Sequence, residues 1–333
     1  MRTIWEYSSR TEALRLLHCA RQIASGFYKA NGFLVLPYPA PAQPNVVSFP
    51  RLPYLTIPRF WQRSSRLDIR TYPFTTPKDL LVTTQQLLAA NPLPSPDFSL
   101  LQLQWSKHQN QILRAIYSLI PKYRKQIRRL HLLPTAFGSS CSFSSDRKRS
   151  EMYIWIRTDS SLTQIVEAIL TSLTRADIFD TLGGTWSESE IVTDWLISFS
   201  PLNPLLRRLD SHWENALTLR STRAKQLAKL KLKSDQFLTQ IGAPEVDLTT
   251  IKNIDTTRFS PQEKQLFQLL LNKSPQLATF DEIADHLYSQ NPDRFSLYAI
   301  SKTVQRLRDQ LESHGISGGF IQTHRGQGYL LAS

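Results

Sequence analysis

The chain has 333 residues, 41% of them hydrophobic and 20% charged, so it is long enough for two or three domains and its composition argues against a disordered protein. It contains no uninterrupted apolar run of about 18 residues, and its N-terminus is polar and periodic, which argues against a membrane span or signal peptide and predicts a cytoplasmic protein. A formal net charge of +13 favours binding to polyanions.

This positive charge is unevenly distributed. Residues 256–333 contain eight basic and seven acidic side chains, a net charge of +1, so the remaining residues carry 13 minus 1, or +12. The two cysteines, Cys19 and Cys141, form no CxxC pair, so we expect structural thiols without a disulfide framework or a cysteine zinc site. No motif in the chain calls for a cofactor.

Residues 1–98 are predicted to form an N-terminal helix followed by a proline-rich arm. The helix is expected over residues 1–30, where apolar residues recur among polar ones. The arm contains "LPYPAPAQPNVVSFPRLPYLTIPRF", whose prolines oppose regular helix and favour an extended chain. A second proline-rich break, "ANPLPSPDFS", marks the start of the next domain, predicted over residues 99–241.

Two basic stretches in residues 99–241 are candidates for phosphate contacts. The first lies in a helical pattern over residues 100–133, and the second in a long helical stretch over residues 205–241. Each could follow a nucleic-acid backbone or form a solvated helix face. The candidate phosphate contacts are Lys122, Arg124, Lys125, Arg128, Arg129, Arg223, Lys225 and Lys229.

The middle of the chain has an α+β pattern. "CSFSSDRKRSEMYIWIR" predicts two strands joined by a charged turn, and "SLTQIVEAILTSLTRADIF" predicts a helix. This order resembles zinc peptidases, in which a helix carries H-E-x-x-H. Here the window is "VEAIL", in which Glu167 occupies the acid position and both ligand positions are aliphatic. The sequence therefore favours plain helix core, with a degenerate, metal-free peptidase-like protein as an alternative.

A connector over residues 242–255 precedes a C-terminal domain over residues 256–333. Its first helix is predicted to begin after Ser260, with Pro261 in the first turn and Glu263 as the reciprocal capping residue. "TFDEIADHLYSQ" and "SLYAISKTVQRLRDQLESHG" predict two further helices, and "GGFIQTHRGQGYLLA" predicts a hairpin with a glycine turn. Three helices and a hairpin form a winged helix-turn-helix.

The same residues resemble the effector domain of OmpR/PhoB-type transcriptional regulators, a bacterial family. "FSPQEKQLFQLLL" is similar to its L-T-x-x-E-x-x-L-L-x-x-L opening, "VQRLRDQL" to its I-x-x-L-R-x-K-L recognition helix, and "IQTHRGQGYLL" to I-x-T-V-R-G-x-G-Y-x-L. The sequence differs from the family at Ser301, where an acid is usual, and at Asp281, where an arginine is usual. These differences affect the expected DNA sequence specificity more than the fold.

A DNA-binding surface is expected on the third helix and the hairpin. The helix is expected to enter the major groove and the wing arginine to approach a minor groove or phosphate. Because successive helical residues are rotated by about 100°, Arg306 and Arg308 cannot both face one base edge, and one of them is expected to be structural. Tyr329 is expected to pack the wing onto the helices. The candidate DNA contacts are Lys302, Thr303, Gln305, Arg306, Arg308, His324 and Arg325.

The residues before this module lack the α/β alternation and early acidic pair of the phosphoreceiver domain that the family normally carries. The sequence thus predicts an α+β multidomain protein: a mainly helical N-terminal region with a small hairpin or sheet, then a winged helix. The expected function is DNA-binding transcriptional regulation without enzymatic activity. Double-stranded DNA is the expected partner, with a homodimer or other protein contact through the N-terminal region and no membrane. The alternative is a winged-helix component of a mobile-element, CRISPR-associated or replication complex.

Overall fold

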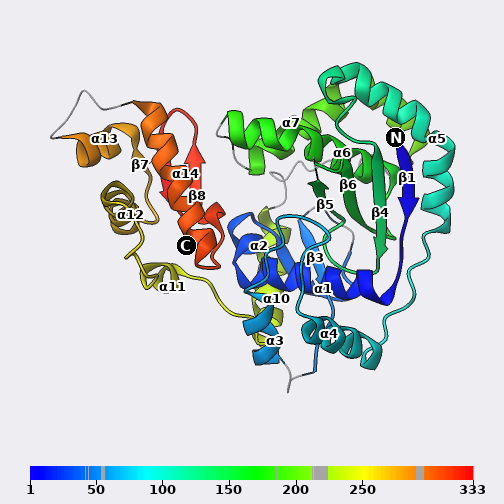
Figure 1. Cartoon of the computed structure of the whole chain (residues 1–333), viewed down its shortest axis with the longest axis horizontal. Coiled ribbons are helices and arrows are strands. Elements are labelled where there is room, and N and C mark those ends of the chain that lie inside the picture. Colours follow the sequence, from blue (N-terminus) through cyan, green and yellow to red (C-terminus); the bar gives the residue numbers. More distant parts are fainter. Residues whose placement is uncertain are drawn as a thin grey trace.

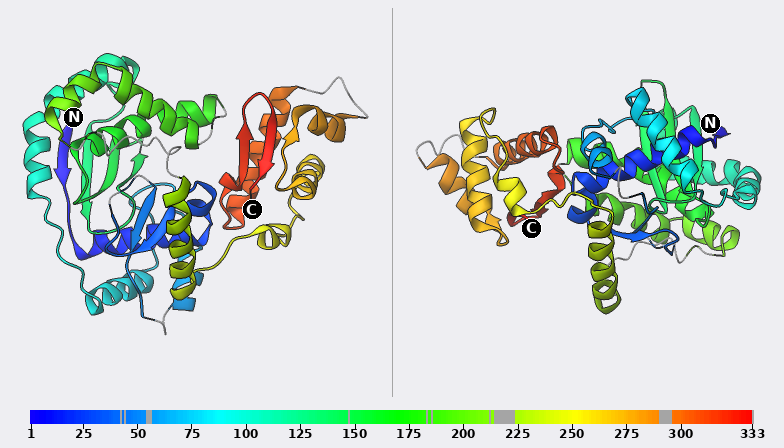
Figure 2. Two further views of the ribbon diagram at one scale, coloured as in Figure 1. Left: turned by 180° about the vertical axis from the view of Figure 1, so that it is seen from behind. Right: turned by 90° about the horizontal axis from the view of Figure 1, so that it is seen from below.

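The structure is a computed structural model of the whole chain. It describes residues 1–332 apart from 42, 44, 54–56, 147, 183, 185, 212, 214–223 and 290–295, and it does not describe the side chains of residues 180, 186, 187 and 224–228. Figures 1 and 2 show a large N-terminal region joined by a connector to a smaller C-terminal lobe. Mixed helices and sheets in both parts confirm the predicted α+β multidomain class.

A four-stranded sheet lies at the centre of the N-terminal region, in the order β1-β4-β6-β5. The inner strands β4 and β6 pair in parallel, β1 joins β4 in parallel, and β5 forms the antiparallel edge. The antiparallel β5–β6 pair confirms the predicted hairpin. The strands are β1 Arg2–Trp5, β4 Arg129–Thr135, β5 Cys141–Asp146 and β6 Glu151–Arg157.

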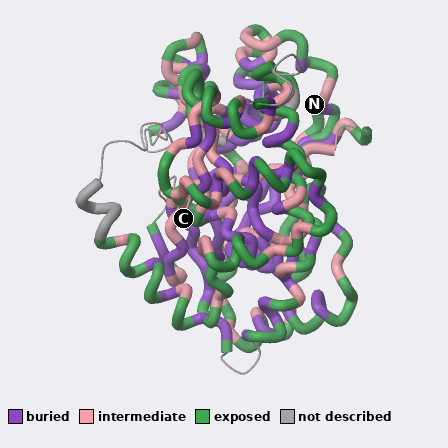
Figure 3. The backbone as a smooth tube through the Cα atoms, turned by 90° about the vertical axis from the view of Figure 1, so that its left-hand side faces the viewer, coloured by how far each residue is buried: buried purple, intermediate pink, exposed green. Residues whose placement is uncertain are grey.

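Alternating side chains of β4 and β6 supply two different cores, because successive residues of a strand point to opposite faces. Leu132 and Ile154 pack with α5 (Ser99–Leu119) and α6 (Leu162–Ala176) on one face. Leu133 and Trp155 pack with α1 (Ser9–Ala24) on the other. Figure 3 shows purple, buried segments gathered in the middle of the molecule with green, exposed segments around them. The sheet is therefore enclosed on both faces, as its apolar strand sequences require.

The helices of the N-terminal region surround this sheet and a second parallel pair formed by β2 Leu34–Pro37 and β3 Val46–Phe49. Two short helical turns follow α5 and α6, namely η2 Pro121–Tyr123 and the π-helical η3 Asp177–Thr181. The α-helices are α1 Ser9–Ala24, α2 Phe27–Ala30, α3 Ile57–Ser64, α4 Lys78–Ala90, α5 Ser99–Leu119, α6 Leu162–Ala176, α7 Trp186–Phe199, α8 Leu202–Leu209 and α10 Ala224–Gln240. No helix within the described parts of the chain combines the length and apolar character required to cross a bilayer.

Three local predictions for this region need correction. Residues 1–30 begin with strand β1 because Arg2–Trp5 pairs with Arg129–Leu132, a long-range contact that outweighs weak helical periodicity. The helix predicted over residues 100–133 ends at Leu119. The basic run from Lys122 to Arg129 therefore lies on η2, a turn and the start of β4. The stretch 205–241 contains α8 and α10, and residues 212 and 214–223 between them lie outside the described residues.

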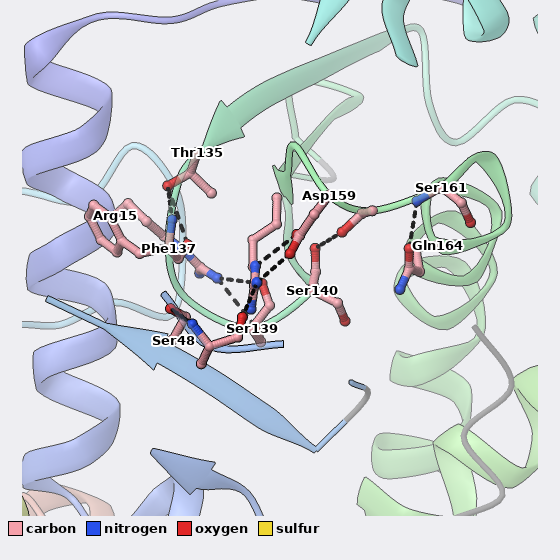
Figure 4. A network of polar contacts seen from close by, with 12 residues as sticks. Arg15, Ser48, Thr135, Phe137, Ser139, Ser140, Asp159, Ser161 and Gln164 are labelled. Carbon is pink, nitrogen blue, oxygen red and sulfur yellow. Dashed lines mark hydrogen bonds and ion pairs between the residues drawn. The ribbon is translucent and has the colours of Figure 1, made fainter. Parts of the chain in front are cut away.

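The turn before β5 is fixed by a buried polar network (Figure 4). The fully buried Arg15 of α1 donates from Nη2 to the hydroxyl of Ser139 at 3.2 Å. Gly138 has φ +99°, and a Cβ there would lie 2.3 Å from the same nitrogen, so only glycine fits. The Arg157 amide donates to the Ser140 carbonyl at 3.0 Å. These contacts hold the start of the edge strand in place.

The C-terminal lobe has its own apolar core, formed by three helices and a small sheet. The sheet order is β7-β9-β8, so the predicted hairpin gains a third, two-residue strand. The elements are α11 Leu248–Lys252, α12 Pro261–Lys273, β7 Ala278–Thr279, α13 Phe280–Tyr288, α14 Leu297–Ser313, η5 Gly318–Phe320, β8 Ile321–His324 and β9 Gly328–Leu331. This is the predicted winged helix-turn-helix.

Candidate DNA-binding surface

Side-chain capping sets the starts of the three helices of the C-terminal lobe. Ser260 and Glu263 form a reciprocal capping box on α12, with Pro261 in its first turn, as predicted. Thr279 caps α13 in the same way with Glu282. Ser296 accepts a hydrogen bond from the Ala299 amide at the start of α14. These caps satisfy amide groups that a helix cannot pair internally, and they fix where the candidate recognition helix begins.

Helix α14 has one buried face and one exposed polar face. Ile300, Val304 and Leu307 are at most 1% exposed and belong to the core of the lobe. On the opposite side Lys302, Gln305 and Arg306 are exposed. Gln305 donates to Asp309 at 3.1 Å. The exposed side thus presents one amide and two cations, groups that hydrogen-bond base edges and phosphates.

Two of the candidate contacts on α14 have structural roles in this conformation. Thr303 is 4% exposed, because it lies beside the core position 304, and its hydroxyl donates to the carbonyl of Ala299. The half-buried Arg308 donates to the carbonyl of Ile321 at 2.8 Å and to Thr323 Oγ1 at 2.8 Å. Arg308 therefore ties the helix to the wing. Thr303 and Arg308, predicted as DNA contacts, instead make contacts within the lobe.

Tyr298 also lies on the exposed surface of α14, although it was not among the predicted DNA contacts. Its side chain is 71% exposed in the first turn of α14, and the Lys302 ammonium lies 5.4 Å from its ring centroid. An aromatic residue four positions before an exposed lysine was the available signal, since i and i+4 share a helical face.

The wing hairpin carries His324 and Arg325 at its exposed tip, where the turn begins. Gly326 has φ +71°, a conformation that glycine adopts easily. At Gly328 a Cβ would lie 1.9 Å from the Ala278 carbonyl oxygen, so glycine is required for β9 to pair with β7. Tyr329 is 4% exposed and packs edge-on against Phe280, consistent with its expected structural role.

The tip of the wing also contacts the N-terminal region. Arg325 Nε lies 2.9 Å from a carboxylate oxygen of Glu188 on α7, and the arginine side chain is 71% exposed. Figures 1 and 2 show β8 and α14 on the side of the lobe that faces this region. The residue expected to contact DNA is thus paired with an acid of the same chain.

The basic run from Lys122 to Arg129 is on the surface, but two of its cations are paired. Lys122 forms an ion pair with Asp177, and Arg129 with the buried Glu151. Arg124, Lys125 and Arg128 are also exposed.

The second basic stretch is described only in part. Lys229 is exposed on α10. Arg223 and the side chain of Lys225 lie outside the described residues.

The middle region offers little to a metal. Glu167 of α6 lines a large cleft, while Val166 and Leu170, which occupy the ligand positions of the peptidase pattern, are fully buried. Among the described residues no group of three or more His, Cys, Asp or Glu side chains is arranged to hold a metal ion. Burial raises the pKa of the Cys19 thiol and of the Cys141 thiol, the expected state of structural cysteines.

Comparison with known proteins places the C-terminal lobe in a family. Residues 255–331 match the family model described as "Transcriptional regulatory protein, C terminal". This part of the chain is an OmpR/PhoB-type DNA-binding domain, as its motifs predicted. No curated protein and no solved structure matches the chain.

Proposed function

We propose that the chain is a transcriptional regulator that binds double-stranded DNA by inserting α14 into the major groove and the wing into an adjacent minor groove. The observation that carries the proposal is the exposed polar face of α14, beside a wing with His324 and Arg325 at its tip, on a lobe of the matching family. Lys302, Gln305 and Arg306 are the proposed contacts on the helix.

We propose further that residues 1–241 act as a regulatory region without enzymatic activity and without phosphoreceiver chemistry. The sheet order β1-β4-β6-β5 with an antiparallel edge supports this, because receiver domains have the parallel order 2-1-3-4-5. The aliphatic residues around Glu167 support the absence of peptidase chemistry. The boundaries at residues 98, 241 and 255 remain predictions.

A selection from randomised duplex DNA tests the DNA-binding proposal. Wild-type protein is expected to enrich a defined motif, and Gln305→Ala or Arg306→Ala to change it at particular positions, at a cost of about 1–3 kcal/mol per lost base contact. Arg258→Ala is the matched control, because Arg258 is exposed on the same lobe, precedes α12 and is not part of α14 or the wing. Failure of the wild-type protein to enrich any motif would refute the proposal.

The alternative, a nucleic-acid-binding component of a mobile-element, CRISPR-associated or replication complex, is favoured by the exposed cations of the N-terminal region. If these cations contact phosphates, replacing Arg124, Lys125 and Arg128 together by serine should reduce the salt dependence of DNA binding. Binding with fewer phosphate contacts releases fewer counterions from the DNA. An unchanged salt slope would show that they are solvated surface.

A further inference from the structure

The C-terminal lobe packs against the N-terminal region through its wing and through the segment that follows α14. Five elements make this contact: η5 and the wing strand β8 on the lobe, and α1, α2 and α7 on the N-terminal region. We propose that this docked arrangement is a closed state that excludes duplex DNA, so that DNA binding requires the two parts to separate. The inference rests on the proposed DNA-binding function.

The closest docking is between η5 and the end of α1. The Ser317 amide donates to the Ser25 carbonyl at 2.8 Å, and Arg21 Nη1 donates to the Gly315 carbonyl at 3.4 Å. The Phe320 ring lies against Gly26, where a Cβ would be 2.6 Å from the ring. Ser317 and Phe320 are at most 2% exposed. A backbone hydrogen bond and a buried aromatic ring make this a packed interface.

The second contact engages the wing. Arg325 pairs with Glu188, and β8 contributes a further hydrogen bond from Gln322 Nε2 to the Ala30 carbonyl at 3.4 Å. A carboxylate and a phosphate oxygen present similar acceptors to a guanidinium. Glu188 therefore competes with DNA for the wing arginine.

Between these contacts lies a cleft of about 1760 Å³ that separates α14 from the N-terminal region. Its lining includes Gln305 and Asp309 of α14 together with Thr171 of α6. A duplex around α14 needs room for a major groove about 12 Å wide and for the two phosphate backbones that flank it. The N-terminal residues that line this cleft together with Gln305 occupy part of that room.

The geometry also locates the hinge. Trp61 of α3 donates to the Ile241 carbonyl at 2.9 Å, which holds residue 241 to the N-terminal region, whereas Val246 is buried in the core of the C-terminal lobe. The residues between them include Gly242, at φ +63°, and Pro244. Separation would break the hydrogen bond from Lys29 Nζ to the Val246 carbonyl and turn the lobe about residues 242–245.

A reversible disulfide provides the decisive test. A Cβ on Gly319 would lie 3.6 Å from the Cβ of Ala30, within the range that a disulfide requires. The full-length double variant Ala30→Cys/Gly319→Cys should form this bond on oxidation and lock the lobe in place. Its affinity is measured by fluorescence anisotropy on the duplex selected with wild-type protein.

We expect the oxidised double variant to lose binding by at least about tenfold, and reduction to restore it to the level of the two single variants. The single variants, oxidised in parallel, control for Cys19 and Cys141. Equal affinity of the oxidised and reduced double variant, with the crosslink verified by mass spectrometry, would overturn the closed state. Absence of binding by reduced and wild-type protein alike would instead refute the DNA-binding function.

A second measurement isolates the wing contact. Glu188→Gln should strengthen DNA binding by up to about fivefold, the range expected for an exposed ion pair. Asp235→Asn is the control, because it removes one negative charge from an exposed position on α10. Equal gains in both variants would refute a specific role for Glu188, since net charge alone would then explain the effect.

Discussion

Arg308 is expected to hold the wing in position relative to the recognition helix α14. Its guanidinium donates to two acceptors on β8, the Ile321 carbonyl and Thr323 Oγ1, both at 2.8 Å. A hydrogen bond from a charged donor contributes about 1.5–3 kcal/mol. Because the side chain is half-buried, the lower value applies to each acceptor, and Arg308→Ala should reduce the free energy of unfolding by about 3 kcal/mol.

Urea unfolding of the full-length protein, followed by circular dichroism, measures this change as a shift of the midpoint at constant slope. Arg306→Ala is the matched control two residues away, where the exposed side chain should contribute less than about 0.5 kcal/mol. Arg308→Lys should recover only part of the loss, because an ammonium lacks the planar fork that reaches both acceptors. Equal midpoints for Arg308→Ala and Arg306→Ala would refute the assigned role.

Three further predictions concern stability and charge. Ser260→Ala should cost about 1 kcal/mol by removing the capping box of α12, and an unchanged urea midpoint would contradict this. Burial lowers the pKa of His18 to about 3. Below pH 6.5 the unfolded state therefore binds a proton at His18 that the folded state does not. The free energy of unfolding should fall by about 2 kcal/mol between pH 6.5 and 5.0. His18→Phe should remove that part of the pH dependence, whereas the exposed His286→Gln should leave it in place. Asp210→Asn should destabilise α6, because the buried carboxylate accepts from the Thr163 amide and hydroxyl at 2.8 and 2.6 Å; a loss below about 0.5 kcal/mol would argue against it.

The winged helix could be predicted from sequence because its signals are local. Ser260 and Glu263 lie three residues apart, and the wing turn is specified by Gly326 and Gly328 within a few residues of the strands they join. The match over residues 255–331 confirms the family that these motifs predicted.

The remaining features depend on contacts between residues far apart in the chain. Pro121 is a local signal that the helix ends before Lys122, but the strand that takes in Arg129 depends on β4 pairing between β1 and β6. The apolar spacing of α14 does place Thr303 on the buried face, three residues after Ile300 and four before Leu307. No local pattern reveals the pairing of Arg325 with Glu188. The sequence therefore predicts α14 and the wing as DNA-binding elements, but not the residues of the N-terminal region that they contact in the closed state.

The position of β1 has a consequence for the synthesis of the protein. Among the described strands, Arg2–Trp5 pairs with β4 alone, which is more than a hundred residues further along the chain. At about 5–20 residues per second on the ribosome, this partner emerges on the order of ten seconds later. During that interval the core that covers Leu14 and Leu17 of α1 lacks Leu133 of β4 and Trp155 of β6. The nascent chain should thus present a chaperone-binding segment until β4 and β6 have been translated.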